Sequence, residues 1–135
     1  RQLSAVKEDA GRFFIEDAKA FVQRELRRGS RYDGILMDPP SYGRGPSGEV
    51  WKLENELFPL AQLCAGLLSD NPLFFLINGY TTGFQPAVLH NILRQAVSPQ
   101  RAGSISSQEL GLPITSGGIL PAGASGRWQA EGALP

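Results

Sequence analysis

The segment between Phe13 and Val97 alternates between short apolar runs and longer stretches in which apolar residues recur at helical spacing. The runs predict strands at residues 12–16, 32–37 and 73–77, and the stretch after each run predicts a helix. Parallel strands need long crossover connections. The order strand, helix, strand, helix, strand, helix therefore predicts the α/β class with a parallel sheet.

Residues that start or stop helices mark the ends of these stretches. Asp17 suits the N-cap of the first helix, and Gly29 follows its last turn as a stop signal. The second helix has an apolar face between residues 57 and 68, and Pro59 fits it only within the first turn. Pro86 opens the third helix.

The composition changes after residue 97, where Gly, Pro and Ser become frequent and strand signals weaken. Ile105–Leu112 and Gly118–Leu120 predict a terminal β-hairpin, with Trp128 near the sheet edge. We expect one folded unit over residues 1–128, followed by a disordered tail over residues 129–135.

The composition restricts the classes of protein to which the chain can belong. It has 135 residues, which suits one domain, and no apolar run long enough to span a membrane. Its formal net charge is zero, which gives no bulk electrostatic case for nucleic-acid binding but is compatible with a local basic patch. Cys64 is the only cysteine, so an internal disulfide is excluded and a cytoplasmic location is expected. Because the chain opens at Arg1 without an initiator Met, we expect it to be part of a longer protein.

The second apolar run ends in Asp38, and Pro39 and Pro40 follow at once. An acid in this place lies at the carboxyl edge of a sheet, where open α/β folds bind their ligands. Both prolines lack an N–H group and fix φ, so the chain is stiff and its carbonyls stay free as acceptors. Together with Tyr42 on the glycine-rich loop that begins at Ser41, this arrangement suits a planar nitrogenous group.

Other readings of these residues stay open. Asp38 also fits the magnesium-binding acid of a P-loop NTPase, but that reading needs a G-x-x-x-x-G-K-S/T loop, which the sequence lacks. Alternatively, Asp38 caps a turn and the prolines only shape a loop. Asp17 is either a simple N-cap or a second acid at the same edge. In the second case its carboxylate accepts a hydrogen bond from the exocyclic amine of a nucleotide-like ligand. The sequence has no cluster with metal-ligand spacing.

Several further polar residues each have a functional and a structural interpretation. Arg44 and Lys52 flank the glycines, where they either meet phosphates or lie on a solvated loop. Asn78 ends the third predicted strand, where it either orients a substrate or closes a turn with Gly79. His90 has no partner in the sequence and is expected at the surface.

The stretch Arg31–Gly45, continued by Gly48–Glu54, carries a family resemblance. It resembles the C-terminal two-thirds of a class I S-adenosylmethionine-dependent methyltransferase domain, most closely the bacterial group that includes the large-subunit ribosomal RNA methyltransferases. Residues 38–40 match that family's motif after its fourth strand. Ile15–Ala18 matches the end of its third strand, where an acid contacts the adenine amine, and Asn78–Tyr80 follows its fifth strand.

The resemblance implies a Rossmann-like, doubly wound sheet without its N-terminal strands, closed by a C-terminal β-hairpin. It also implies S-adenosylmethionine as cofactor and RNA as substrate, with ribosomal RNA as the expected kind. The implied catalytic residues are Asp38, Pro39 and Tyr42, and the implied cofactor contacts are Asp17, Ala18 and Asp38. The implied substrate contacts are Pro40, Ser41, Arg44, Lys52 and Asn78.

Two departures from the family pattern shape the expectation. The family's glycine-rich loop after the first strand and the acid that ends its second strand have no counterpart here, so the isolated chain should bind cofactor poorly. No cysteine occurs at residues 38–43 or 78–83, and Cys64 falls within a helix, so covalent catalysis at a pyrimidine carbon is disfavoured. We therefore expect methyl transfer to nitrogen, with a P-loop NTPase or a non-catalytic RNA- or protein-binding remnant as alternatives.

Overall fold

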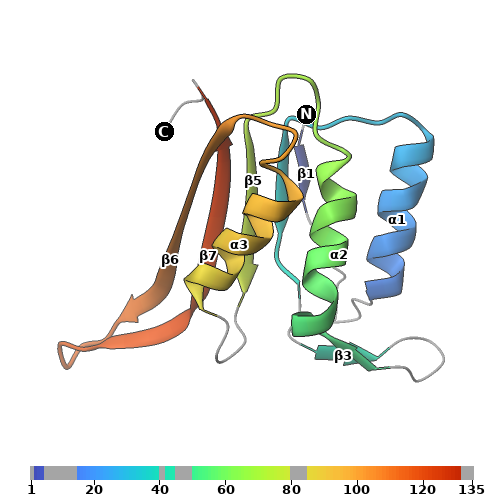
Figure 1. Ribbon diagram of the computed structural model, residues 1–135. Helices are drawn as coiled ribbons and strands as arrows, with labels where there is room; N and C mark the ends of the chain where they lie inside the picture. The colour runs from blue at the N-terminus through green and yellow to red at the C-terminus, as the bar shows by residue number, and fades with distance from the viewer. Residues whose placement is uncertain (1, 5–14, 40–41, 45–49, 80–84, 132–135) are drawn as a thin grey trace.

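The computed structural model describes residues 2–4, 15–39, 42–44, 50–79 and 85–131, and these form three helices and seven strands (Figure 1). In chain order the elements are β1 (Gln2–Ser4), α1 (Ile15–Arg27), β2 (Gly34–Met37), β3 (Tyr42–Arg44), β4 (Val50–Lys52), α2 (Leu53–Ala65), β5 (Phe74–Gly79), α3 (Pro86–Ala96), β6 (Gly103–Pro113) and β7 (Ile119–Ala130).

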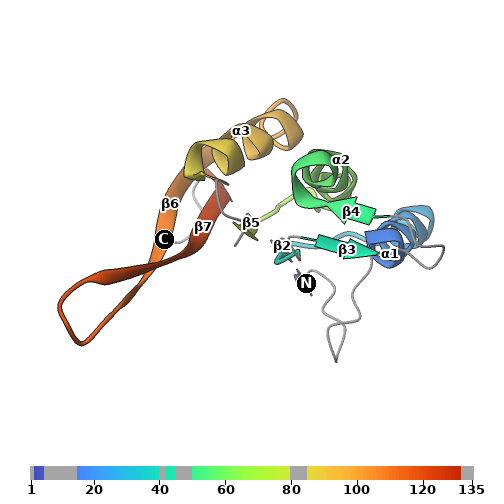
Figure 2. The same ribbon diagram turned by 90° about the horizontal axis from the view of Figure 1, so that it is seen from below.

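The main sheet has five strands in the order β1-β2-β5-β7-β6. Strands β1, β2 and β5 are parallel, whereas β7 runs antiparallel to both β5 and β6. All three helices lie on one side of this sheet (Figure 2). The predicted α/β class with a parallel sheet and a terminal hairpin is confirmed, and none of the described helices is long and apolar enough to cross a membrane.

The core lies between the helices and the sheet. Alternate residues of the central strands are buried there, as the period of two along a strand requires. The largest fully buried side chains from the strands are those of Ile35, Met37, Phe75, Ile77 and Trp128. Leu57 and Leu67, from α2 and the turn after it, and Leu89 and Leu93 from α3 close the core from the helical side.

Helix α1 begins earlier than the sequence predicted. Ile15 and Glu16, which were predicted to end a strand, lie in its first turn, whereas residues 12–14 are outside the described part of the chain. Asp17 consequently lies inside the helix and is not its N-cap. Ile15, Ala18 and Val22 are three and four residues apart, so the apolar face of the helix already begins at Ile15, within the predicted strand. The strand beside β2 is β1 instead.

Pro59 is also placed differently from the prediction. Helix α2 starts at Leu53, so Pro59 lies in its second turn and not in its first. Its missing N–H leaves one backbone carbonyl of the helix without its usual partner. Pro59 itself is exposed on the outer side of the helix.

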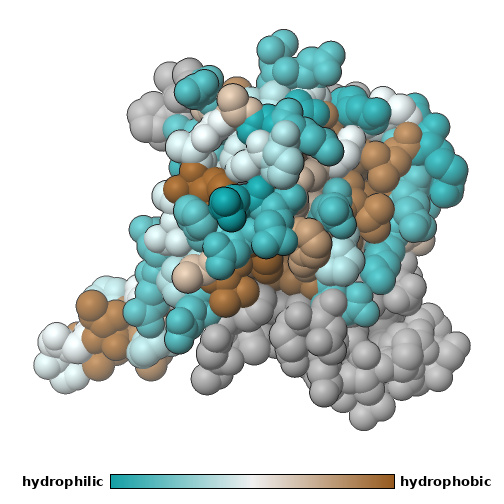
Figure 3. All heavy atoms as spheres, viewed as in Figure 1, coloured by the Kyte–Doolittle hydropathy of each residue, from teal (hydrophilic) through white to brown (hydrophobic). Residues whose placement is uncertain are grey.

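The terminal hairpin is longer than predicted. Strand β7 extends to Ala130, so residues 129 and 130 belong to the sheet and not to a tail, and residues 132–135 are outside the described part. Trp128 is fully buried on an interior strand, not near the edge. The far end of the hairpin projects from the body of the molecule (Figure 1). It carries exposed apolar side chains, brown at the lower left of Figure 3, from Leu112, Ile114, Ile119 and Leu120.

Candidate functional site

The carboxyl edge of the parallel strands brings the predicted acid and amide together. Strands β2 and β5 are adjacent and parallel, and Met37 is the register partner of Ile77. Asp38 and Asn78 are the next residues, so they occupy neighbouring positions at the edge, on strands about 4.8 Å apart. This is the place where open α/β sheets bind ligands.

The residues at this edge differ in their exposure to solvent. Asp38 is exposed, and Pro39 beside it is buried. The carboxylate is thus available to a ligand while the following residue is anchored in the protein. Pro40 and Ser41, two of the predicted substrate contacts, lie outside the described residues.

The loop predicted after Asp38 contains a small antiparallel hairpin. Its strands β3 and β4 pair Tyr42 with Lys52 and Arg44 with Val50, and residues 45–49 are outside the described part. The backbone register therefore brings together three residues that the sequence analysis placed on one open loop. The hairpin lies at the end of the molecule where α2 begins (Figure 1).

The predicted adenine-side residues lie on α1. This helix begins at the same end of the molecule as the carboxyl edge of β2 and β5 (Figure 1). Ala18 is buried in the core, and Asp17 precedes it in the first turn. Lys19 forms an ion pair of 3.3 Å with Glu56, which joins α1 to α2. Asp17 and Asp38 thus share one end of the fold but come from a helix and a strand end.

Strand β7 adds a residue that the sequence analysis missed. Ser125 is half-buried and pairs in register with Asn78, next to the pair of Gly79 and Ala124. Its hydroxyl group belongs to the same edge as the Asn78 amide. The sequence signal was the unbroken run of small residues at positions 122–126, since glycine within a strand often marks a close approach of another backbone.

Cys64 takes no part in this edge, and no metal-ligand cluster is found among the described residues. Cys64 is buried in α2, and burial raises the pKa of its thiol to about 12. It is therefore a core residue, as predicted, and not a thiolate nucleophile. His90 in α3 is half-buried. Within the described ranges, no three His, Cys, Asp or Glu residues are grouped so that they could hold a metal ion.

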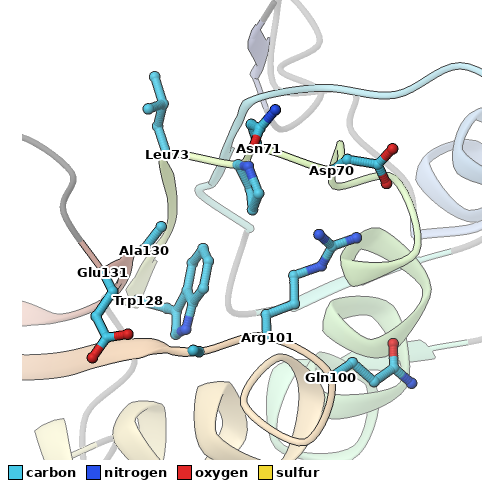
Figure 4. Close-up of a pocket in the computed structure, with 10 residues that line it drawn as sticks. Asp70, Asn71, Leu73, Gln100, Arg101, Trp128, Ala130 and Glu131 are labelled. Atoms are coloured by element: carbon cyan, nitrogen blue, oxygen red, sulfur yellow. The ribbon is translucent and has the colours of Figure 1, made fainter.

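A cavity of about 490 Å³ lies at the opposite, amino edge of the sheet. Figure 4 shows the side chains of Trp128 and Arg101 on its wall, with Asp70 and Glu131 on either side. Arg101 donates to the carbonyl oxygens of Ser69 and Leu68, the latter at 2.9 Å. These bonds tie the end of the α2 segment to the start of β6, so Arg101 has a structural role in the fold.

Comparison with solved structures places the fold among methyltransferases. The chain is 33% identical to the SAM-dependent methyltransferase from Agrobacterium tumefaciens, with a TM-score of 0.75 over 84% of this chain and 38% of that one. It is 15% identical to SMU.776, a putative methyltransferase complexed with SAH, with a TM-score of 0.61 over 86% of this chain and 30% of that one.

A third similar structure is the M1.HpyAVI–SAM complex, at 11% identity and a TM-score of 0.55 over 99% of this chain and 55% of that one. No protein-family model matches the sequence, and no curated protein matches it. The chain spans little more than a third of the Agrobacterium protein. Among the predicted alternatives, these likenesses favour the methyltransferase fold over that of a P-loop NTPase.

Proposed function

We propose that this chain, which is part of a class I S-adenosylmethionine-dependent methyltransferase domain, serves methyl transfer to a nucleobase nitrogen in RNA, with ribosomal RNA as the substrate. The observation that carries the proposal is the register of β2 and β5, which sets Asp38-Pro39 beside Asn78 at the carboxyl edge. This arrangement offers a carboxylate, a carbonyl and an amide to one planar group.

The chemistry follows from these acceptors. A nucleobase nitrogen must direct its lone pair in line with the methyl group that it receives. The Asp38 carboxylate and the Pro39 carbonyl accept hydrogen bonds from an N–H of the base and so orient that lone pair. The rate gain comes mainly from this positioning. S-adenosylmethionine, when bound, supplies the methyl group as a sulfonium electrophile.

The other candidate residues would bind either the cofactor or the substrate base. Asp17 and Ala18 at the start of α1 would hold the adenine side of the cofactor, together with Asp38. Tyr42 would stack on the base, as aromatic side chains do in other nucleic-acid sites. If the base lies within folded RNA, it must leave its stack to reach this edge.

The substrate contacts proposed beyond these residues belong to three segments. Pro40 and Ser41 follow Asp38-Pro39, and Asn78 is the next-to-last residue of β5. Arg44 and Lys52 belong to the hairpin of β3 and β4, where guanidinium and ammonium groups suit RNA phosphates. The reaction is proposed for the cytoplasm, where the lone thiol of Cys64 stays reduced.

The state of Cys64 supports nitrogen over carbon as the methyl acceptor. Methylation at carbon 5 of a pyrimidine requires a cysteine thiolate at the site. Cys64 is the only cysteine of the chain, it is 5% exposed within α2, and its pKa is raised to about 12. Direct transfer to nitrogen needs no such nucleophile.

The test is methyl transfer by the full-length protein that contains this chain and by its Asp38→Ala variant, because the chain alone is expected to bind cofactor poorly. We expect RNA to gain tritium from methyl-labelled S-adenosylmethionine with the unaltered protein and to gain none with Asp38→Ala. Calorimetry on the same variant should still detect cofactor binding, because the proposed contacts at Asp17 and Ala18 remain in place. Asp70→Ala, an exposed acid at the amino edge, is the matched control and should keep its activity. Normal turnover by Asp38→Ala would refute the role of this carboxylate.

A further inference from the structure

The charge of the chain is distributed unevenly. The whole sequence has 13 basic and 13 acidic residues. Residues 19–31, however, contain five basic residues and a single acid, Glu25. Four of these basic residues are Arg24, Arg27, Arg28 and Arg31, named here the arginine stripe. The zero net charge thus conceals a basic segment over the C-terminal part of α1 and the turn that follows it.

The structure places the arginine stripe at the surface. All four of its residues are exposed. Arg24 and Arg27 lie three residues apart in the last turn of α1, on one side of the helix, whereas Arg28 and Arg31 belong to the turn that follows it. Hydrophilic side chains gather along this side of the molecule, at the right of Figure 3.

Few acids neutralise the arginine stripe. Glu25 is buried and accepts a hydrogen bond from the Tyr32 hydroxyl, and its other oxygen lies 3.5 Å from Arg28. The guanidinium of Arg24 lies over the ring of Phe21, 5.5 Å from its centre. In the part of the chain that the structure describes, no carboxylate lies within ion-pair distance of Arg24, Arg27 or Arg31.

Helix stability explains only part of this cluster. Arg24 and Arg27 lie in the last turn of α1, where positive charge is favourable to the helix dipole. Arg31 lies beyond the end of the helix, and its guanidinium donates to the carbonyl of the adjacent Ser30 at 2.7 Å. Four like charges within eight residues also repel one another, and an anionic partner would relieve that repulsion.

We propose that the arginine stripe binds the phosphate backbone of the RNA substrate, an inference that rests on the proposed function. Arginine presents a planar fork of N–H donors that matches two phosphate oxygens. The stripe surrounds the last turn of α1, and Asp38 lies toward the end where this helix begins (Figure 1). The 13-residue helix spans about 20 Å, so one RNA can contact the stripe while its target base reaches the carboxyl edge.

The test compares the double variant Arg27→Gln/Arg31→Gln with the parent protein. The probe is a fluorescein-labelled RNA hairpin, and binding is followed by fluorescence anisotropy over a salt series. We expect the double variant to bind about tenfold more weakly at low salt, with the slope of log K against log salt reduced by about 2. The matched control is Arg94→Gln, another exposed arginine in the last turn of a helix, and it should bind like the parent.

The outcomes separate this inference from the proposed function. If the double variant keeps the parent's RNA affinity and salt slope, the proposal that the arginine stripe binds RNA is overturned. An equal loss of RNA affinity with Arg94→Gln would overturn it too. Loss of binding to phosphatidylserine vesicles with RNA binding unchanged would assign the stripe to a membrane and overturn the inference as well. In these cases the proposed function stands if the parent protein still binds the hairpin and S-adenosylmethionine. If the parent binds cofactor but no RNA, both the RNA substrate and the stripe are refuted.

Discussion

At the scale of single residues, burial decides which polar groups are structural and which are open to ligands. Glu25 is buried in α1, and the hydroxyl of Tyr32 donates to its carboxylate. Asp38, by contrast, is exposed at the carboxyl edge. The sequence alone does not show which of the two acids is internal. Their burial in the fold makes Glu25 an internal hydrogen-bond acceptor and leaves Asp38 as a candidate catalytic group.

The hydrogen bond to Glu25 predicts a dependence of stability on pH. The Tyr32 hydroxyl, assisted by Ser30 and the nearby arginines, lowers the pKa of the Glu25 carboxyl below its ordinary value. The unfolded chain then binds the proton more readily, so this stabilisation is present above the unfolded pKa and is lost as pH falls through the folded one. Tyr32→Phe should lower the melting temperature at pH 7 more than at pH 3. Equal losses at both pH values would contradict this account of Glu25.

The burial of Cys64 predicts that its thiol is unreactive in the folded protein. With a pKa raised to about 12, the thiol stays protonated between pH 7 and pH 9. A disulfide reagent such as dithionitrobenzoate should therefore label less than a tenth of the protein in an hour, and label it fully in guanidinium chloride. Fast labelling of the native protein would show that Cys64 is accessible and would reopen covalent catalysis.

At the scale of elements, the contact between α3 and β7 fixes one side of the candidate site. Gly126 lies in β7, one residue after Ser125, and faces α3. A Cβ atom at Gly126 would lie 2.8 Å from the Cβ of Leu89 and 3.3 Å from Cδ1 of Leu93. Glycine at this position therefore lets the helix approach the strand that carries the edge residues.

This close approach predicts a loss of stability when Gly126 is enlarged. Gly126→Ala should lower the free energy of unfolding by about 1–3 kcal/mol, because the added methyl group pushes against Leu89. The measurement is urea denaturation followed by circular dichroism. Ser107→Ala, at the register partner of Gly126 in β6, is the control and should change stability by less than about 0.5 kcal/mol. A neutral Gly126→Ala would mean that α3 shifts freely on the sheet.

At the scale of the whole molecule, the elements that could be predicted from the sequence are those with a repeating pattern of apolar residues. All three predicted helices and the second and third predicted strands are present, because periods of two and 3.6 are local properties. The same patterns misplaced the start of α1, where Ile15 fits both an apolar run and the helical period. They also left the hairpin of β3 and β4 as a loop, since two strands of three residues among glycines give almost no periodic signal.

Part of the candidate site could also be predicted from the sequence. Asp38 and Asn78 were each identified as residues that end a strand, and the parallel pairing of β2 with β5 then joined them. Ser125 was missed because its place depends on the pairing of β7 with β5, in which it meets Asn78, a residue 47 positions earlier in the chain. The arginine stripe was concealed by the zero net charge, because a total carries no information on how charges are arranged.

The central claim is that the carboxyl edge directs a methyl group to a nucleobase nitrogen. The most direct test digests RNA methylated by the protein to nucleosides and locates the new methyl group by mass spectrometry and chromatography against standards. The account predicts a single nucleoside that carries the methyl group on a ring or exocyclic nitrogen. A methyl group on a pyrimidine carbon or a ribose oxygen, or no methylated nucleoside at all, would contradict it.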